Sequence, residues 1–202
     1  MACGTPAPPT LTGSTLDCRR GSESQLGSPG GTTSTPRQVA TPYTPVSPGW
    51  TAAAVGSYHT CALLARDSSL WCWGSGGVGE LGDGSSVSSE APRQVSASGA
   101  FLQVRLGSVH ACALKSTGML VCWGLGTSGQ IGNNVSLSVN VPTAVTDPDA
   151  QSPFIQVSAA GTYSCGVKQT GLVYCWCAAA VAGAAAVAAA SASAAAAAAA
   201  AT

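Results

Sequence analysis

Short apolar runs recur along the chain, separated by stretches rich in glycine, serine and proline, and none has the spacing of an amphipathic helix. The run 101–106 alternates apolar and polar side chains only in part, as a buried strand can. A His-x-Cys run follows at 110–112, then Leu-x-Cys-Trp at 120–123, a glycine-rich stretch, and a closing Pro-x-x-Val segment at 142–145. We therefore predict an all-β chain built from units of up to four short strands.

The same unit recurs at a period of roughly fifty residues. Residues 59–74 begin His-Thr-Cys and end Leu-Trp-Cys-Trp-Gly, and residues 110–124 begin His-Ala-Cys and end Leu-Val-Cys-Trp-Gly. Residues 163–177 begin Tyr-Ser-Cys and end Val-Tyr-Cys-Trp-Cys. Such self-similarity marks a repeat architecture, and repeat folds bind through surfaces and loops far more often than they catalyse.

A degenerate copy of the repeat, which we call the worn copy, precedes these three. Residues 13–39 match parts of the segment 67–95, and Cys3 falls where the first cysteine of a pair belongs. We therefore divide the chain into copies near 1–39, 40–95, 96–145 and 146–177, the outer two incomplete, followed by an alanine-rich tail at 178–202.

Charge is scarce, with 8% charged residues and a formal net charge of zero. No basic patch or acidic run is present, so sequence-independent binding to nucleic acid or to an anionic membrane has no electrostatic basis. The 25 glycines and 12 prolines suit a β protein with many turns.

Most of the nine cysteines fall into pairs that are 10 or 11 residues apart. For two of these pairs, placing the cysteines opposite each other in a hairpin leaves a three-residue loop, 116–118 in one and 169–171 in the other. Both loops end in glycine, where a type I turn with a bulge needs a left-handed residue. Facing strand residues lie within disulfide reach. We therefore predict cross-strand disulfides at Cys61–Cys72, Cys112–Cys122 and Cys165–Cys175, and a further pair, Cys3–Cys18, in the worn copy.

Metal binding is the competing interpretation of the cysteines. Zinc sites place paired ligands two to four residues apart, and only Cys175 and Cys177 are that close. We favour disulfides, which indicate an oxidising compartment: outside the cell, the periplasm or the secretory lumen. Asn134 begins an Asn-Val-Ser glycosylation sequon on an expected loop, which agrees with secretion. Cys177 is left unpaired, free or linked to another molecule, where the other copies have glycine.

The middle copies resemble the repeat of the regulator of chromosome condensation family. They share Gly-x-x-His-x-Cys-Ala-Leu, then Leu-x-Cys-Trp-Gly, then Gly-(Gln/Glu)-(Leu/Ile)-Gly, then proline. The resemblance covers roughly residues 13–177 and implies a seven-bladed β-propeller, of which three to four partial blades are present. The cysteine-paired form resembles extracellular versions in crinkly-type plant receptor kinases and in secreted bacterial and algal proteins. Four partial copies cannot close such a ring, so we expect a piece of a longer chain or an assembly with other chains.

Residues 178–202 leave the pattern in the middle of a copy, although their length suffices to finish a blade. Our hypothesis is that these alanines stand for residues whose side chains were not identified. Alanine is weakly apolar and no aromatic or basic anchors flank the tail, so we do not expect a membrane span. Residues 1–6 lack the basic start and apolar core of a signal peptide, so we expect the native N-terminus to lie upstream or to have been trimmed.

Two glycine-rich segments, 74–79 and 124–129, fit the dinucleotide-binding pattern Gly-x-Gly-x-x-Gly. That site needs a helix after the glycines and an acidic residue some twenty positions on, and a turn follows here instead. His59 and His110 share one position of the repeat, where the third copy has Tyr163, so a structural role is favoured over metal binding or catalysis. The tryptophans at 73, 123 and 176 likewise indicate packing between blades.

We find no nucleophile elbow and no zinc-protease helix. Acid pairs are scarce, and the acidic residues that could form one fall on expected turns, where aspartate is preferred for local backbone bonding: Asp67, Glu80, Asp83, Glu90, Asp147 and Asp149. We therefore expect no catalysis, no cofactor and no metal. The sequence favours an extracellular structural or protein-interaction module in a surface, adhesion or fibre assembly, whose partner is another protein, a second copy or the rest of a longer chain. Two other functions stay open. One is a guanine-nucleotide exchange factor for a small GTPase, the role of the family's nuclear founder, and the other is a secreted enzyme-inhibiting propeller.

Overall fold

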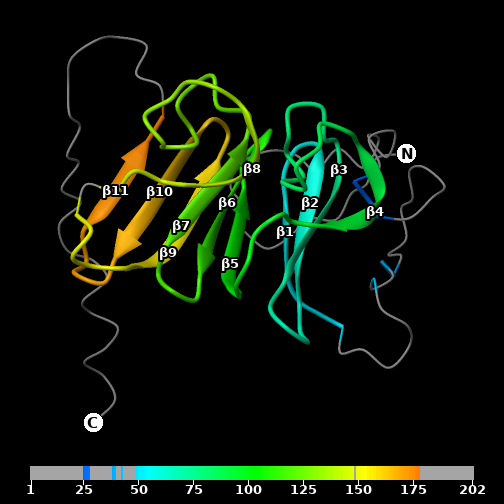
Figure 1. Ribbon diagram of the computed structural model, residues 1–202, viewed down its shortest axis with the longest axis horizontal. Coiled ribbons are helices and arrows are strands. Elements are labelled where there is room, and N and C mark those ends of the chain that lie inside the picture. The colour runs from blue at the N-terminus through cyan, green and yellow to red at the C-terminus, as the bar shows by residue number, and fades with distance from the viewer. Residues whose placement is uncertain (1–24, 28–37, 40–41, 43–48, 148, 178–202) are drawn as a thin grey trace, which may run out of the picture.

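The computed structural model describes residues 25–27, 38–39, 42, 49–147 and 149–177 (Figure 1). All regular elements in these ranges are β-strands, which confirms the all-β prediction. The alanine-rich tail, the predicted Cys3–Cys18 pair and most of the worn N-terminal copy lie outside the described residues. Within the described residues no helix is long and apolar enough to cross a membrane.

The strands form three antiparallel sheets, which we call blades 1 to 3. Blade 1 contains β1 (Trp50–Val55), β2 (His59–Leu64), β3 (Leu70–Gly74) and β4 (Ser89–Gln94). Blade 2 contains β5 (Phe101–Leu106), β6 (His110–Lys115), β7 (Leu120–Gly124) and β8 (Val139–Ala144). Blade 3 contains β9 (Phe154–Ala160), β10 (Tyr163–Lys168) and β11 (Val173–Trp176). In each blade, strands that follow one another in sequence are neighbours in the sheet.

The second and third strands of each blade form the hairpin that the cysteine spacing predicts. In blade 2, Cys112 lies directly opposite Cys122, and the turn contains Gly118 at a φ of 80°. Gly171 has a φ of 84° in the matching turn of blade 3. Because L side chains rarely adopt this conformation, glycine at the end of the loop fixes the register of the hairpin.

The apolar cores join neighbouring blades. The first core includes Leu81 of blade 1 and Trp123 of blade 2, and the second includes Ile131 of blade 2 and Phe154 of blade 3. The first strands also meet, since β1 contacts β5 and β5 contacts β9. Figure 1 shows the three sheets side by side, which is the arrangement of consecutive propeller blades. The fold is therefore a run of β-propeller blades, as predicted.

Candidate functional site

A tryptophan in the third strand of each blade donates a hydrogen bond to the main chain of the preceding repeat. The indole Nε1 of Trp123 lies 2.9 Å from the carbonyl oxygen of Glu80. The same contact, at the same distance, joins Trp73 to Gln25 and Trp176 to Gln130. We call each of these three contacts a tryptophan latch. Because each latch joins adjacent repeats, the Leu-x-Cys-Trp and Gly-(Gln/Glu)-(Leu/Ile)-Gly motifs form the interface between blades.

The last glycine of the Gly-(Gln/Glu)-(Leu/Ile)-Gly motif makes room for the latched ring. Gly82 has a φ of 66°, and a Cβ there would lie 2.6 Å from Nε1 of Trp123. Gly132 has a φ of 74°, and a Cβ there would lie 2.6 Å from Nε1 of Trp176. A side chain at either position would strain the backbone and displace the indole.

At two of the three latches, the side chain of the residue that supplies the carbonyl also holds its own turn in place. Glu80 is only 2% exposed, and its carboxylate accepts hydrogen bonds from the Val78 amide at 2.8 Å and the Ser75 hydroxyl at 3.2 Å. Gln130 is fully buried, and its Oε1 accepts from the Ser128 amide at 2.8 Å. Sequence reasoning assigned Glu80 to an ordinary turn and missed this role. Its recurrence as Gln or Glu in the motif was the available signal.

The structure joins the three predicted cysteine pairs as disulfides. The bonds are Cys61–Cys72, Cys112–Cys122 and Cys165–Cys175, with Cα atoms 4.0 to 4.1 Å apart. The four cysteines of blades 1 and 2 are completely buried. Each described blade is therefore cross-linked by its own disulfide through its central hairpin.

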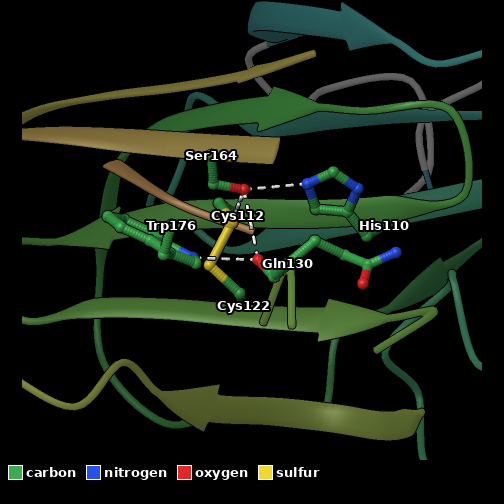
Figure 2. The surroundings of a disulfide bond; sticks show 6 residues. All are labelled: His110, Cys112, Cys122, Gln130, Ser164 and Trp176. Carbon is green, nitrogen blue, oxygen red and sulfur yellow. Dashed lines mark hydrogen bonds between the residues drawn. A yellow bond between two sulfur atoms is a disulfide. The ribbon is translucent and has the colours of Figure 1, made fainter. Parts of the chain in front are cut away.

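One of these disulfides lies beside a polar network that bridges blades 2 and 3 (Figure 2). The hydroxyl of Ser164 lies 2.8 Å from Nε2 of His110 and donates to the carbonyl oxygen of Gln130 at 3.2 Å. Its distance to Sγ of Cys112 is 3.4 Å. The Gln130 carbonyl oxygen therefore accepts both from this hydroxyl and from the latched Trp176.

The two histidines lie in the interfaces between blades. Burial, with a smaller contribution from the nearby His110, lowers the pKa of His59 to about 3. Burial also lowers the pKa of His110 to about 4. Neither ring nitrogen of His59 has a hydrogen-bond partner among the described residues, whereas His110 has Ser164. Both histidines are therefore neutral at neutral pH.

A buried lysine, which sequence reasoning did not single out, fixes the connection between blades 2 and 3. The Lys168 side chain is 0% exposed and forms an ion pair with Asp147. Its Nζ also donates to the carbonyl oxygens of Asp149 and Ser152, each at 2.6 Å, and lies 4.2 Å from the centre of the Phe154 ring. The matching Lys115 is partly exposed and donates to Ser98, so the repeat pattern alone did not distinguish the two lysines.

A groove of about 450 Å³ lies between β11 and the turn 129–136, which joins β7 to β8 in blade 2. Gly129, Gly132 and Asn134 line one side, and Phe154, Tyr174 and Trp176 line the other. Asn134, the predicted glycosylation site, is exposed and has a φ of 61°. Cys177 also lines the groove, and it is exposed and not disulfide-bonded. In the described part of the chain, no group of three or more His, Cys, Asp or Glu side chains could hold a metal ion.

Two sequence models of one repeat family match the chain. The first, described as the regulator of chromosome condensation (RCC1) repeat, matches residues 67–114 and 117–167. The second has the same description and matches residues 50–80 and 101–130. A comparison with curated protein sequences gives no match.

Solved structures share the arrangement of strands. Human WBSCR16 has a TM-score of 0.67 at 20% identity, over 78% of this chain and 40% of that one. Yeast RCC1 (Prp20) bound to Kap60 has a TM-score of 0.55 at 23% identity, over 66% of this chain and 30% of that one. Prp20p from Saccharomyces cerevisiae has a TM-score of 0.53 at 22% identity, over 63% and 32%. The chain thus spans less than half the length of each structure, and the likeness establishes the fold alone.

Proposed function

The chain belongs to the regulator of chromosome condensation (RCC1) repeat family, and from that premise we propose that it is an extracellular protein-interaction module. Its blades serve as a scaffold in a surface, adhesion or fibre assembly and carry out no catalysis. The observation that carries the proposal is that each described blade has its own disulfide across its central hairpin. Disulfides persist in oxidising compartments and are rare in the cytosol and nucleus.

The stability of small blades gives a reason for these cross-links. A blade of short strands joined by long loops buries little apolar surface of its own, and the two apolar cores both lie between blades. A disulfide that closes a loop of about ten residues contributes roughly 2–3 kcal/mol by restricting the unfolded chain. Three such cross-links favour a role in which the protein must persist outside the cell.

The absence of catalysis is part of the same proposal. The buried histidines have strongly lowered pKa values and lie in the interfaces between blades, where they contribute to packing. The Glu80 carboxylate accepts hydrogen bonds within its own turn, and Lys168 forms an ion pair with Asp147 in the connection between blades 2 and 3. These four buried ionisable side chains therefore already serve the fold.

The exchange-factor role needs a reducing compartment, where thiols stay reduced, and the disulfides argue against it. One yeast RCC1 structure is bound to Kap60, and the other is described with binding to Gsp1p and histones. Their sequence identity to this chain is low enough that the match supports the fold but not these partners. A glycan on Asn134 belongs to the proposed secreted form, since this residue is exposed in the blade 2 turn.

Production of the chain in an oxidising and in a reducing bacterial compartment tests the proposal. We expect folded protein with three disulfides from the periplasm, and a melting temperature at least about 10 °C lower, or no folded protein, from the cytoplasm. We also expect no acceleration of guanine-nucleotide release from small GTPases. Equal melting temperatures with free thiols in the cytoplasmic protein would instead favour the exchange-factor role.

A further inference from the structure

The disulfides of blades 1 and 2 lie in the apolar cores that these blades share with the blade that follows. Cys112 and Cys122 of blade 2 belong to the second core, together with Phe154 and Val157 of blade 3. The disulfide of blade 1 has the same place in the first core, which blade 2 completes. All four cysteines are completely buried. A reductant in solution therefore cannot reach either bond while the following blade is docked.

Reduction of a disulfide needs direct approach to one of its sulfur atoms. The thiolate of a dithiol reductant attacks one sulfur, the sulfur–sulfur bond breaks, and the other sulfur leaves as a thiolate that takes up a proton. The second thiol of the reductant then attacks the mixed disulfide, which frees the second protein thiol and leaves the reductant as a cyclic disulfide. Because the attack requires access, exchange at a completely buried bond must wait until the blades open locally.

A serine of blade 3 contacts the blade 2 disulfide and links the two blades (Figure 2). The Ser164 hydroxyl lies 3.4 Å from Sγ of Cys112 and 2.8 Å from Nε2 of His110. It also donates to the carbonyl oxygen of Gln130 at 3.2 Å. All four residues are completely buried. Opening of this interface therefore breaks the buried contacts of the hydroxyl in the same step that exposes the sulfur.

The interface between blades 1 and 2 lacks this link. Ala111 stands in the repeat where blade 3 has Ser164, and alanine has no hydroxyl. His59 therefore does not gain the partner that His110 has, and both of its ring nitrogens are unpaired among the described residues. The two buried disulfides thus lie under similar apolar covers, and of these two covers only the one from blade 3 is held by a buried hydroxyl.

We propose that the following blade acts as a lid over each of these two disulfides, and that Ser164 sets how often the lid over Cys112–Cys122 opens. Reduction of that bond is then coupled to separation of blades 2 and 3. Because such coupling is reciprocal, breaking the bond also favours separation of the blades. The interface is thus a redox-sensitive device within the fold, and it depends neither on the partner nor on the compartment of the protein.

The test follows reduction of the folded, fully oxidised chain by dithiothreitol. Samples are alkylated at successive times, and peptide mapping gives the rate at each disulfide separately, with the blade 3 disulfide scored in the same samples. We expect Ser164→Ala to speed reduction of the blade 2 disulfide at least fivefold, because loss of the buried hydroxyl raises the population of the open interface by that factor. The rate at the blade 1 disulfide should stay within twofold of wild type, since Ser164 does not contact its cover.

Two further variants serve as matched controls. Ser164→Thr should keep the wild-type rate within twofold, because Thr60 holds this position in blade 1 and its hydroxyl donates to the Gln25 carbonyl oxygen at 3.0 Å. Ala111→Ser should slow reduction of the blade 1 disulfide at least twofold and leave that of blade 2 unchanged.

Equal acceleration of both buried disulfides in Ser164→Ala would mean that exchange follows global unfolding, and it would overturn the proposal. Unchanged rates in both Ser164→Ala and Ala111→Ser would overturn it as well. If Ser164→Ala does not fold, the rate at the blade 1 disulfide in Ala111→Ser decides alone. None of these outcomes alters the disulfide-based function, because every measurement starts from the oxidised protein.

Discussion

The Nε1 atom of Trp123 donates to the carbonyl oxygen of Glu80, a residue 43 positions earlier in the chain, at 2.9 Å. The acceptor belongs to the main chain, so the identity of residue 80 can vary between Glu and Gln without losing the bond. The donor is the only N–H that an indole side chain has. This explains why the tryptophan is the same in all three repeats while its partner residue alternates.

Replacement of Trp123 with phenylalanine should therefore weaken the interface between blades 1 and 2. The variant keeps an aromatic ring but leaves the buried Glu80 carbonyl without this donor, at a cost of about 1–3 kcal/mol in the free energy of unfolding. Urea unfolding measures the loss. Trp71→Phe is the matched control, because the Trp71 indole donates to Ser69 within its own hairpin. A loss as large in the control as at Trp123 would count against the latch.

His110 contacts Ser164, whereas the repeat places Ala111 at the matching position for His59. Exchanging alanine and serine at these two positions should change the free energy of unfolding in opposite directions. Ala111 precedes Cys112 as Ser164 precedes Cys165. Ala111→Ser should give His59 the hydroxyl partner that His110 has and raise the free energy of unfolding by about 0.5–1.5 kcal/mol. Ser164→Ala should lower it by about 1–3 kcal/mol, because buried His110 loses its partner. Thermal unfolding of both variants tests this, and a destabilised Ala111→Ser protein would contradict it.

Lys168 should matter far more than the lysine at the same position of the previous repeat. Lys168→Met removes the ion pair with Asp147 and leaves the carbonyl oxygens of Asp149 and Ser152 without their donor. We expect a loss of about 2–3 kcal/mol, moderated by the partial exposure of Asp147. Lys115→Met serves as control and should cost less than about 1 kcal/mol. Equal losses in chemical denaturation would show that the buried contacts of Lys168 add nothing.

The lowered pKa values of the histidines predict a loss of stability in acid. His59 titrates at about 3 and His110 at about 4 in the folded protein, against 6.5 ordinarily. Below pH 6.5 the unfolded chain therefore binds more protons than the folded one, and the free energy of unfolding falls as the pH falls towards 4 and 3. The contribution is about 1.4 kcal/mol per pKa unit and per histidine.

His59→Leu provides the control for this pH dependence. Neither ring nitrogen of His59 has a hydrogen-bond partner among the described residues, so the variant loses no such bond there and should unfold with a shallower dependence on pH between 6.5 and 4. Denaturant unfolding at a series of pH values measures the slope. An unchanged slope in the variant would mean that other groups cause the acid sensitivity.

Much of the architecture could be predicted from local signals in the sequence. The spacing of cysteines and the glycine at positions 118 and 171 define hairpins, and these are interactions between residues about ten apart. The pattern also indicated that Trp73, Trp123 and Trp176 pack between blades. For the hairpins, one repeat contains all the residues that determine the outcome.

The contacts between repeats could not be predicted in the same way. The latch joins a side chain to a main-chain carbonyl more than forty residues away, and a main-chain acceptor leaves no residue type to recognise. The different burial of Lys168 and Lys115 depends on the connection before each blade, which varies between repeats. Single copies of a repeat show the strands but not which surface meets the neighbouring blade.

Peptide mapping of the native protein by mass spectrometry, without reduction, tests the central claim most directly. A secreted interaction module with one cross-link per blade predicts linked peptides for Cys61–Cys72, Cys112–Cys122 and Cys165–Cys175, with Cys177 outside these pairs. Free thiols at all six positions in the native protein would contradict the extracellular assignment and put the exchange-factor role in its place.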